Sequence, residues 1–328
     1  MSIKKIALTA AVIAGAALPA AAQDPVLYTS NPVPAYEAVQ QAVKSEAGLN
    51  LGVITGGSGV LLRRIEAEAS RPQGDIFWSS SANTLGVYED FFEAHHGPAL
   101  EVVRQDLRYP GDLFTPSNIH VAAMLINTDY LDDPETLPNT WADLASPAWN
   151  GKIIIADPAN SSTGYTIVWG LSKLLDEATY KAIVGNMVVS GSSSEVPRSV
   201  SMGEYTIGLT FESSGYAYVD GGQEELKLVY PSDGTFLTAD YAGLIKGAPA
   251  GEAAKQAMDA LLSQESQIEL LKVAFRRPSR SDIKVSDYVA LPELEDIAVF
   301  PFDEIEAAEA REAFLAEWAA LPKAADVQ

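Results

Sequence analysis

Strand-like and helix-like stretches alternate along this 328-residue chain, and the alternation constrains its fold more than any other feature. Apolar strands are expected at residues 26–30, 49–55 and 75–78, with helices between them at 32–47 and from Ser58 onward. Parallel neighbouring strands need a crossover connection, which is usually a helix. The β-α-β-α-β order therefore predicts an α/β fold in which helices flank a mainly parallel sheet.

A second series of elements follows the first. Strands are expected at 120–126, 152–156, 205–211, 227–230 and 242–245, and helices at 162–175, 196–202, 252–262, 265–273 and 304–321. Two short segments rich in proline or glycine, 109–116 and 231–234, are interpreted as hinge crossovers, which predicts two lobes. The expected division is lobe 1 at 23–115, lobe 2 at 116–231, a return to lobe 1 at 232–280, and a C-terminal helical segment at 281–328 that packs on the lobes.

The N-terminus has the pattern of a secretory signal peptide. Lys4 and Lys5 precede an apolar run at 6–18, and Ala20-Ala21-Ala22 satisfies the small-x-small rule, so cleavage is expected after Ala22. The run is shorter than the roughly 20 residues that a membrane-spanning helix needs. We therefore expect an exported, periplasmic protein that is not inserted in the membrane.

The composition limits the chemistry. The chain has 44 acidic and 22 basic residues, so its charge repels nucleic acid and anionic lipid, and neither is expected as a partner. It has no cysteine and three histidines, and it contains no phosphate-binding Walker loop, zinc-type spacing or nucleophile elbow. We expect no catalytic residue, no metal site and no cofactor. A Ser-His-Asp hydrolase that recruits His120, His95 or His96 is the enzymatic alternative.

Short hydroxyl residues and glycines follow five of the expected strands, at the strand ends where open α/β sheets bind ligands. Two of these clusters, Gly57-Ser58 and Ser162-Thr163, also begin helices, whose N-termini attract phosphate, phosphonate or carboxylate groups. Ordinary capping explains any single cluster, but the recurrence favours a ligand site. The candidate ligand-binding residues are Ser30, Gly57, Ser58, Ser80, Ser162, Thr163, Glu212, Ser214, Tyr216 and Tyr241.

Glu212 has two interpretations, because it ends an apolar strand and precedes a possible helix near Gly215. Its carboxylate either holds an ammonium group or hydroxyls of a ligand, or caps that helix. Tyr216 and Tyr218 are two residues apart and do not share a helix face, so only one of them is expected to line a cleft.

Several segments together resemble a known family. They include Gly74-Asp75-Ile76-Phe77-Trp78 and Phe275-Arg276-Arg277-Pro278, as well as 26–30, 57–59, 63–68, 137–144 and 158–164. They resemble the extracellular solute-binding proteins of the ferric-iron, polyamine and phosphonate importers. The resemblance implies a two-lobed "Venus flytrap" that closes around a small ligand and delivers it to an ABC permease with a separate ATPase. We expect a monomer.

Ferric-binding members of that family coordinate iron with two adjacent tyrosines, often helped by a histidine and a glutamate. At the corresponding positions this chain has Ser213-Ser214, Asn31 or Pro32, and Ser80. The departure favours a small phosphonate- or phosphate-bearing organic ligand, such as 2-aminoethylphosphonate or a sugar phosphate. A ferric-ion receptor is the alternative.

Overall fold

The computed structural model describes residues 23–131, 133, 137–301 and 303–325. The expected signal peptide at 1–22 lies outside the described residues. Along the described ranges, no helix combines the length and the apolar character needed to cross a membrane.

The first half of the molecule is built on three parallel strands, β1 (Val26–Thr29), β2 (Gly52–Thr55) and β3 (Ile76–Trp78), with β1 in the middle. Successive side chains of a strand point to opposite faces, so Leu27 and Ile76 pack on one side and Tyr28 and Phe77 on the other. The first side is covered by the helices α1 (Val33–Ala47), α8 (Glu252–Leu261) and α9 (Gln264–Ala274). The second side is covered by α2 (Ser58–Ala67) and the short α3 (Ala82–Leu85).

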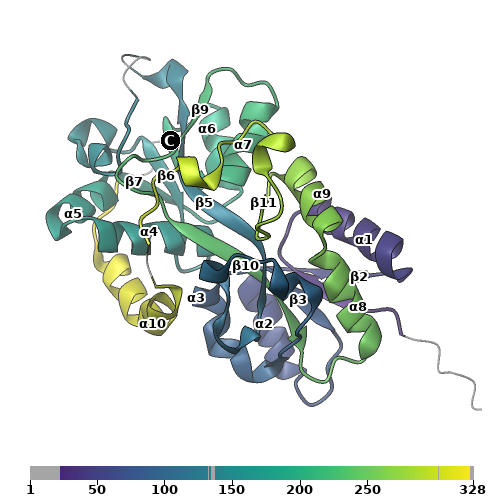
Figure 1. The fold of residues 1–328 in the computed structure, drawn as a ribbon. Helices are drawn as coiled ribbons and strands as arrows, with labels where there is room; N and C mark the ends of the chain where they lie inside the picture. Colours follow the sequence, from purple (N-terminus) through teal and green to yellow (C-terminus); the bar gives the residue numbers. More distant parts are fainter. Residues whose placement is uncertain (1–22, 132, 134–136, 302, 326–328) are drawn as a thin grey trace, which may run out of the picture.

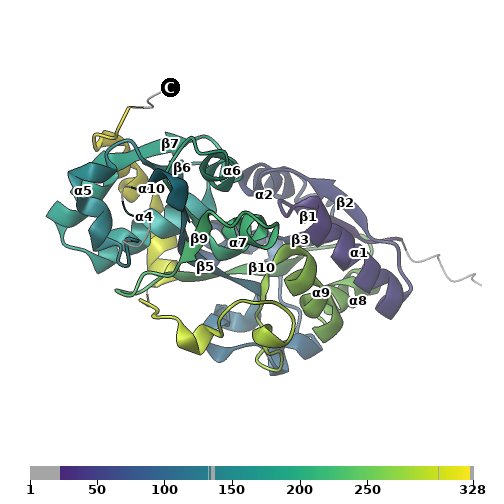
Figure 2. The ribbon, with the colours of Figure 1, turned by 90° about the horizontal axis from the view of Figure 1, so that it is seen from above.

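The second half repeats this arrangement with β6 (Ile153–Ala156) between its parallel neighbours β7 (Met187–Ser190) and β8 (Ile207–Phe211). Helices α4 (Ser162–Leu174) and α5 (Glu177–Asn186) pack on one face, against Ile153 and Ile155. Helix α6 (Glu195–Ser201) packs on the other, against Ile154, and α7 (Glu212–Asp220) follows β8 directly. Figures 1 and 2 show the two halves side by side.

Two long strands join the halves, β5 (Thr115–Asn127) and β10 (Leu237–Ile245). Strand β5 pairs with β10 as far as Val121 and with β8 from Ala122, which gives the order β2-β1-β3-β10-β5-β8-β6-β7. The partner of β5 thus changes between Val121 and Ala122, inside the strand, and the segment 231–234 lies in the connection between β9 and β10. The hinges expected at 109–116 and 231–234 stay predictions. The pairs made by β5 and β10 are antiparallel, whereas the outer strands of each half pair in parallel as predicted.

The remaining short strands border this framework: β4 (Phe92–Glu93) and β11 (Arg277–Pro278) in the first half, and β9 (Leu226–Val229) in the second. The last helix, α10 (Glu304–Ala320), is capped by Asp303, whose carboxylate accepts hydrogen bonds from the backbone N–H groups of Ile305 and Glu306. It lies outside the sheet and packs against both α3 and α4 (Figure 1). The lobe boundaries expected from the sequence stay predictions.

Candidate ligand-binding cleft

A cleft of about 500 Å³ lies between the two halves. The first half contributes the ends of β1 and β3 and the beginnings of α2 and α3, and the second half contributes the loop between β6 and α4. Its volume is within the range of small-molecule sites in proteins. The cleft therefore has the position and size expected of a site at strand ends.

Two helix N-termini face this cleft. Helix α2 begins after Gly57, which provides no side-chain cap, and the Ser58 Oγ lies 2.8 Å from the Ser30 Oγ. Helix α4 is capped by the Ser161 Oγ, which accepts a hydrogen bond from the Gly164 N–H at 3.1 Å. The unpaired N–H groups and the dipole of a helix N-terminus favour an anion.

Glycine is required at position 164 because α4 begins close against the end of β6. A Cβ atom there would lie far inside van der Waals contact with the backbone carbonyl of Ala156. This close approach brings the N-terminus of α4 to the edge of the sheet and thus into the cleft.

Ser80 has the least ordinary conformation in the cleft. Its φ of 71° lies in the left-handed region, which residues other than glycine rarely adopt, and its side chain is only 3% exposed. Among the described residues, no group forms a hydrogen bond with its Oγ. A strained backbone and an unpaired buried hydroxyl both carry a free-energy cost, and such features concentrate at functional sites.

The part of the cleft that the described residues form contains no acidic side chain, although the chain has twice as many acids as bases. None of the described residues that line it is Asp or Glu, whereas Arg63 and Arg311 both line it. In the part of the chain that the structure describes, neither arginine forms an ion pair with a carboxylate. The local charge is therefore positive within a strongly acidic protein.

The structure brings together half of the residues predicted from the sequence. Ser30, Gly57, Ser58, Ser80 and Ser162 line the cleft. Thr163 and Ser214 are partly buried and do not line it.

Glu212 is placed differently from our expectation. It is the first residue of α7 and is 1% exposed, and its two oxygens accept hydrogen bonds from the Arg277 Nε and Nη2 at 2.7 Å each. The Tyr230 hydroxyl donates to the same carboxylate. Because this carboxylate is buried and paired inside the protein, the prediction that it receives a ligand ammonium is wrong for this structure.

The two predicted tyrosines are also core residues in the structure. The Tyr241 hydroxyl donates to the backbone oxygen of Leu107 at 2.9 Å, and the side chain is 4% exposed. Tyr216 is 8% exposed and packs edge-on against Phe275. Neither tyrosine is among the residues that line the cleft, so the structure does not bring them together with the serines there.

A second polar cluster lies where the resemblance placed the ferric ligands. The Arg276 guanidinium contacts the Asn31 Oδ1 at 3.3 Å and the Ser213 Oγ at 3.4 Å, so it links the two halves. It also donates to the Nδ1 of His120 at 2.8 Å. The Nε2 of His120 lies 3.0 Å from an Asp240 carboxylate oxygen and 3.1 Å from the same arginine nitrogen. Burial lowers the pKa of His120, so its ring is neutral at pH 7.

Sequence reasoning missed Arg63, Arg276 and Arg311. Arg276 belongs to a segment that carried the family resemblance, which was the available signal. Arg311 belongs to the terminal helix. It is far along the sequence from any strand end, and no sequence pattern identified it as a site residue. Across the described residues, no group of three or more His, Asp or Glu side chains is placed to hold a metal ion.

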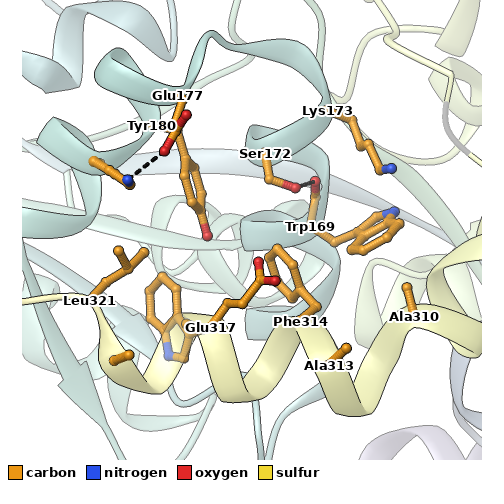
Figure 3. A pocket seen from close by; sticks show the side chains of 13 residues that line it. Trp169, Ser172, Lys173, Glu177, Tyr180, Ala310, Ala313, Phe314, Glu317 and Leu321 are labelled. Atoms are coloured by element: carbon orange, nitrogen blue, oxygen red, sulfur yellow. Dashed lines mark hydrogen bonds and ion pairs between the residues drawn. The ribbon is translucent and has the colours of Figure 1, made fainter.

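A larger hollow of about 670 Å³ lies elsewhere, between α4, α5 and α10. Figure 3 shows Trp169 of α4 and Phe314 of α10 facing each other there, with Lys173 and Glu317 nearby. None of the residues predicted for the ligand site lines this hollow, and it lies on the helices of the second half rather than at the strand ends.

Comparisons with known proteins agree with this architecture. Residues 73–307 match the family described as "Bacterial extracellular solute-binding protein". A putative 2-aminoethylphosphonate-binding periplasmic protein of Salmonella typhi is 22% identical over 77% of this chain and 76% of its own length. The periplasmic binding protein AfuA of Actinobacillus pleuropneumoniae, with fructose 6-phosphate bound, superposes with a TM-score of 0.81 at 24% identity, over 91% of this chain and 98% of its own. Iron-bound HitA of Pseudomonas aeruginosa superposes with a TM-score of 0.79 at 19% identity, over 91% and 99% of the two chains.

The family match covers well over half of the chain, and the structural matches confirm the predicted two-lobed α/β architecture. This protein therefore belongs to the bacterial extracellular solute-binding proteins, with a periplasmic-binding-protein fold, and it is the solute-binding component of an ABC importer rather than an enzyme.

Proposed function

We propose that the cleft binds a small organic molecule through a phosphate or phosphonate group and that the protein delivers it from the periplasm to an inner-membrane permease with a separate ATPase. The observation that carries this proposal is an acid-free cleft at two helix N-termini, with the buried Ser80 hydroxyl unpaired inside it. Backbone N–H groups and hydroxyls bind a phosphoryl oxygen without a dedicated lysine.

Within that class, the geometry favours a phosphate ester of a sugar or polyol over an aminoalkylphosphonate. A ligand ammonium group needs a carboxylate or a set of acceptors, and no Asp or Glu is among the described residues that line the cleft. The carboxylate expected for that task, Glu212, is bound to Arg277. Sugar hydroxyls find serine and asparagine partners in the cleft, at Ser58, Asn83 and Asn160.

The ferric alternative is supported by the similarity to iron-bound HitA, but the site chemistry disfavours it. Ferric ion prefers anionic oxygen ligands, and the positions that the resemblance gave to them hold Asn31 and Ser213. The Arg276 guanidinium already contacts both residues, and a fixed positive charge there repels a trivalent cation.

Thermal unfolding of the mature protein with candidate ligands tests the proposal. Fructose 6-phosphate, glucose 6-phosphate, 2-aminoethylphosphonate, fructose and ferric citrate are each added in excess. A ligand at 100 times its dissociation constant stabilises the folded state by about 2.7 kcal/mol, which raises the melting temperature measurably. We expect a shift with phosphate esters and none with fructose. A shift with ferric citrate alone contradicts the proposal.

A further inference from the structure

Helix α10 connects the two halves of the molecule from outside the sheet. Its first residue, Glu304, accepts a hydrogen bond from the Thr238 hydroxyl of β10 at 2.9 Å, and the helix packs along α3 of the first half. Further along, Phe314 packs edge-on against Trp169 of α4 in the second half (Figure 3). The helix is thus fixed to both sides of the cleft.

Arg311 extends from the middle of this helix into the cleft. Its guanidinium lies over the Tyr165 ring, 4.1 Å from the centroid, and its Nη2 donates to the backbone oxygen of Pro158 at 3.2 Å. These two contacts hold the side chain in one orientation. The Nη1 atom is buried and, among the described residues, has no hydrogen-bond partner.

We propose that Arg311 is a ligand-binding residue, and that its free Nη1 edge binds the anionic group of the solute. This inference rests on the proposed function of the cleft. A buried donor without a partner costs free energy in the empty protein, and an anion placed against it recovers that free energy as affinity. Because the ring of Tyr165 and the carbonyl of Pro158 already fix the guanidinium, little side-chain entropy is lost on binding.

The position and charge of Arg311 make it a determinant of specificity. It lies on a helix outside the sheet. The strand ends supply hydroxyls and helix N-termini, which bind neutral and anionic oxygens alike. Arg311 adds a fixed positive charge and thereby favours a charged solute over a neutral one of the same shape.

Titration calorimetry with fructose 6-phosphate tests the inference in the full mature protein. Arg311→Met removes the charge and the donors, and Arg311→Lys keeps the charge but loses the planar fork. Lys173→Met is the matched control: Lys173 also lies over an aromatic ring of α4, at 4.4 Å from the Trp169 centroid, but it lines the other hollow and not the cleft. Thermal unfolding without ligand checks that each variant is folded.

We expect Arg311→Met to weaken binding 10- to 100-fold, Arg311→Lys to weaken it less, and Lys173→Met to bind within 2-fold of the wild type. Equal affinity of Arg311→Met and the wild type overturns the inference and leaves the proposed function intact. Equal losses in Arg311→Met and Lys173→Met also overturn it, because the effect then comes from the packing of α10. If Arg311→Met is unfolded, the affinity of Arg311→Lys decides, and wild-type affinity there overturns the inference. Absence of wild-type binding to every phosphate and phosphonate tested overturns the proposed function itself, and the inference with it.

Discussion

The substitution Glu212→Gln separates a structural role of this residue from a role in ligand binding. In the structure Glu212 and Arg277 form a two-bond ion pair, with both side chains only 2% exposed. Glutamine keeps the shape of the side chain but removes the charge and one acceptor oxygen. The Arg277 guanidinium then stays buried without a counter-charge, and its Nη1 already has no hydrogen-bond partner among the described residues.

The expected effect on stability is large. Breaking a buried ion pair by removing one partner costs about 3–5 kcal/mol, compared with a total stability of about 5–15 kcal/mol for a typical protein. Chemical denaturation measures this cost as a lower midpoint with an unchanged slope. Glu177→Gln is the matched control, because Glu177 pairs with Lys181 at the surface, where its side chain is 80% exposed. An exposed pair of this kind contributes little to stability, so the midpoint of Glu177→Gln should stay close to that of the wild type.

Two further measurements complete the test. The double variant Glu212→Met with Arg277→Met removes both charges, and we expect it to recover most of the lost stability. The affinity of Glu212→Gln for fructose 6-phosphate, measured below its unfolding transition, should equal that of the wild type. If Glu212→Gln is as stable as the wild type but binds the ligand more weakly, the reasoning is refuted and Glu212 is a ligand-binding residue.

Three more predictions follow from other residues. Gly164→Ala should lower both the melting temperature and the ligand affinity, because its Cβ displaces the start of α4 from the Ala156 carbonyl; calorimetry measures both. Ser80→Gly should raise the melting temperature by relieving the left-handed backbone, yet weaken ligand binding through loss of the hydroxyl; a less stable variant contradicts this. Burial raises the pKa of Glu304 to about 7 in the folded state, whereas its ordinary value is 4.5. Between these two pH values the folded state binds more protons than the unfolded state, so the free energy of unfolding should fall as the pH rises from 4.5 to 7. Glu304→Gln should flatten that part of the stability profile measured by denaturation, and an unchanged profile contradicts the assignment.

The sequence predicted the framework of this protein well because each element carries its own local signal. Helices α2 and α4 begin at Ser58 and Ser162, as predicted, although Ser58 is the first residue of α2 and not its cap. The two joining strands were harder to predict. Strand β5 begins at Thr115 rather than 120, and its polar first half is buried by pairing with β10, which no local pattern reveals.

The sequence predicted those residues of the candidate site whose place in the cleft follows from the position of the backbone. Serines and glycines at strand ends face the cleft because the topology places strand ends there. Long side chains were predicted less well, since their direction depends on partners that are distant in the sequence: Glu212 turns to Arg277, 65 residues away, and Tyr241 turns to Leu107. Arg311 enters the cleft only because α10 packs beside α4.

The distribution of arginines gives the strongest argument for an anionic solute. In a chain with 44 acidic residues, a carboxylate partner is readily available to any arginine, and Arg277 has one in Glu212. Arg276 is held by His120, which in turn contacts Asp240. Arg71 and Arg198 also lack a carboxylate partner among the described residues, but they lie outside the cleft. Arg63 and Arg311 share the cleft, beside helix N-termini that add to the same positive potential. Uncompensated positive charge in one place is costly to maintain in the absence of an anion, and a solute that brings its own negative charge is the partner that removes this cost.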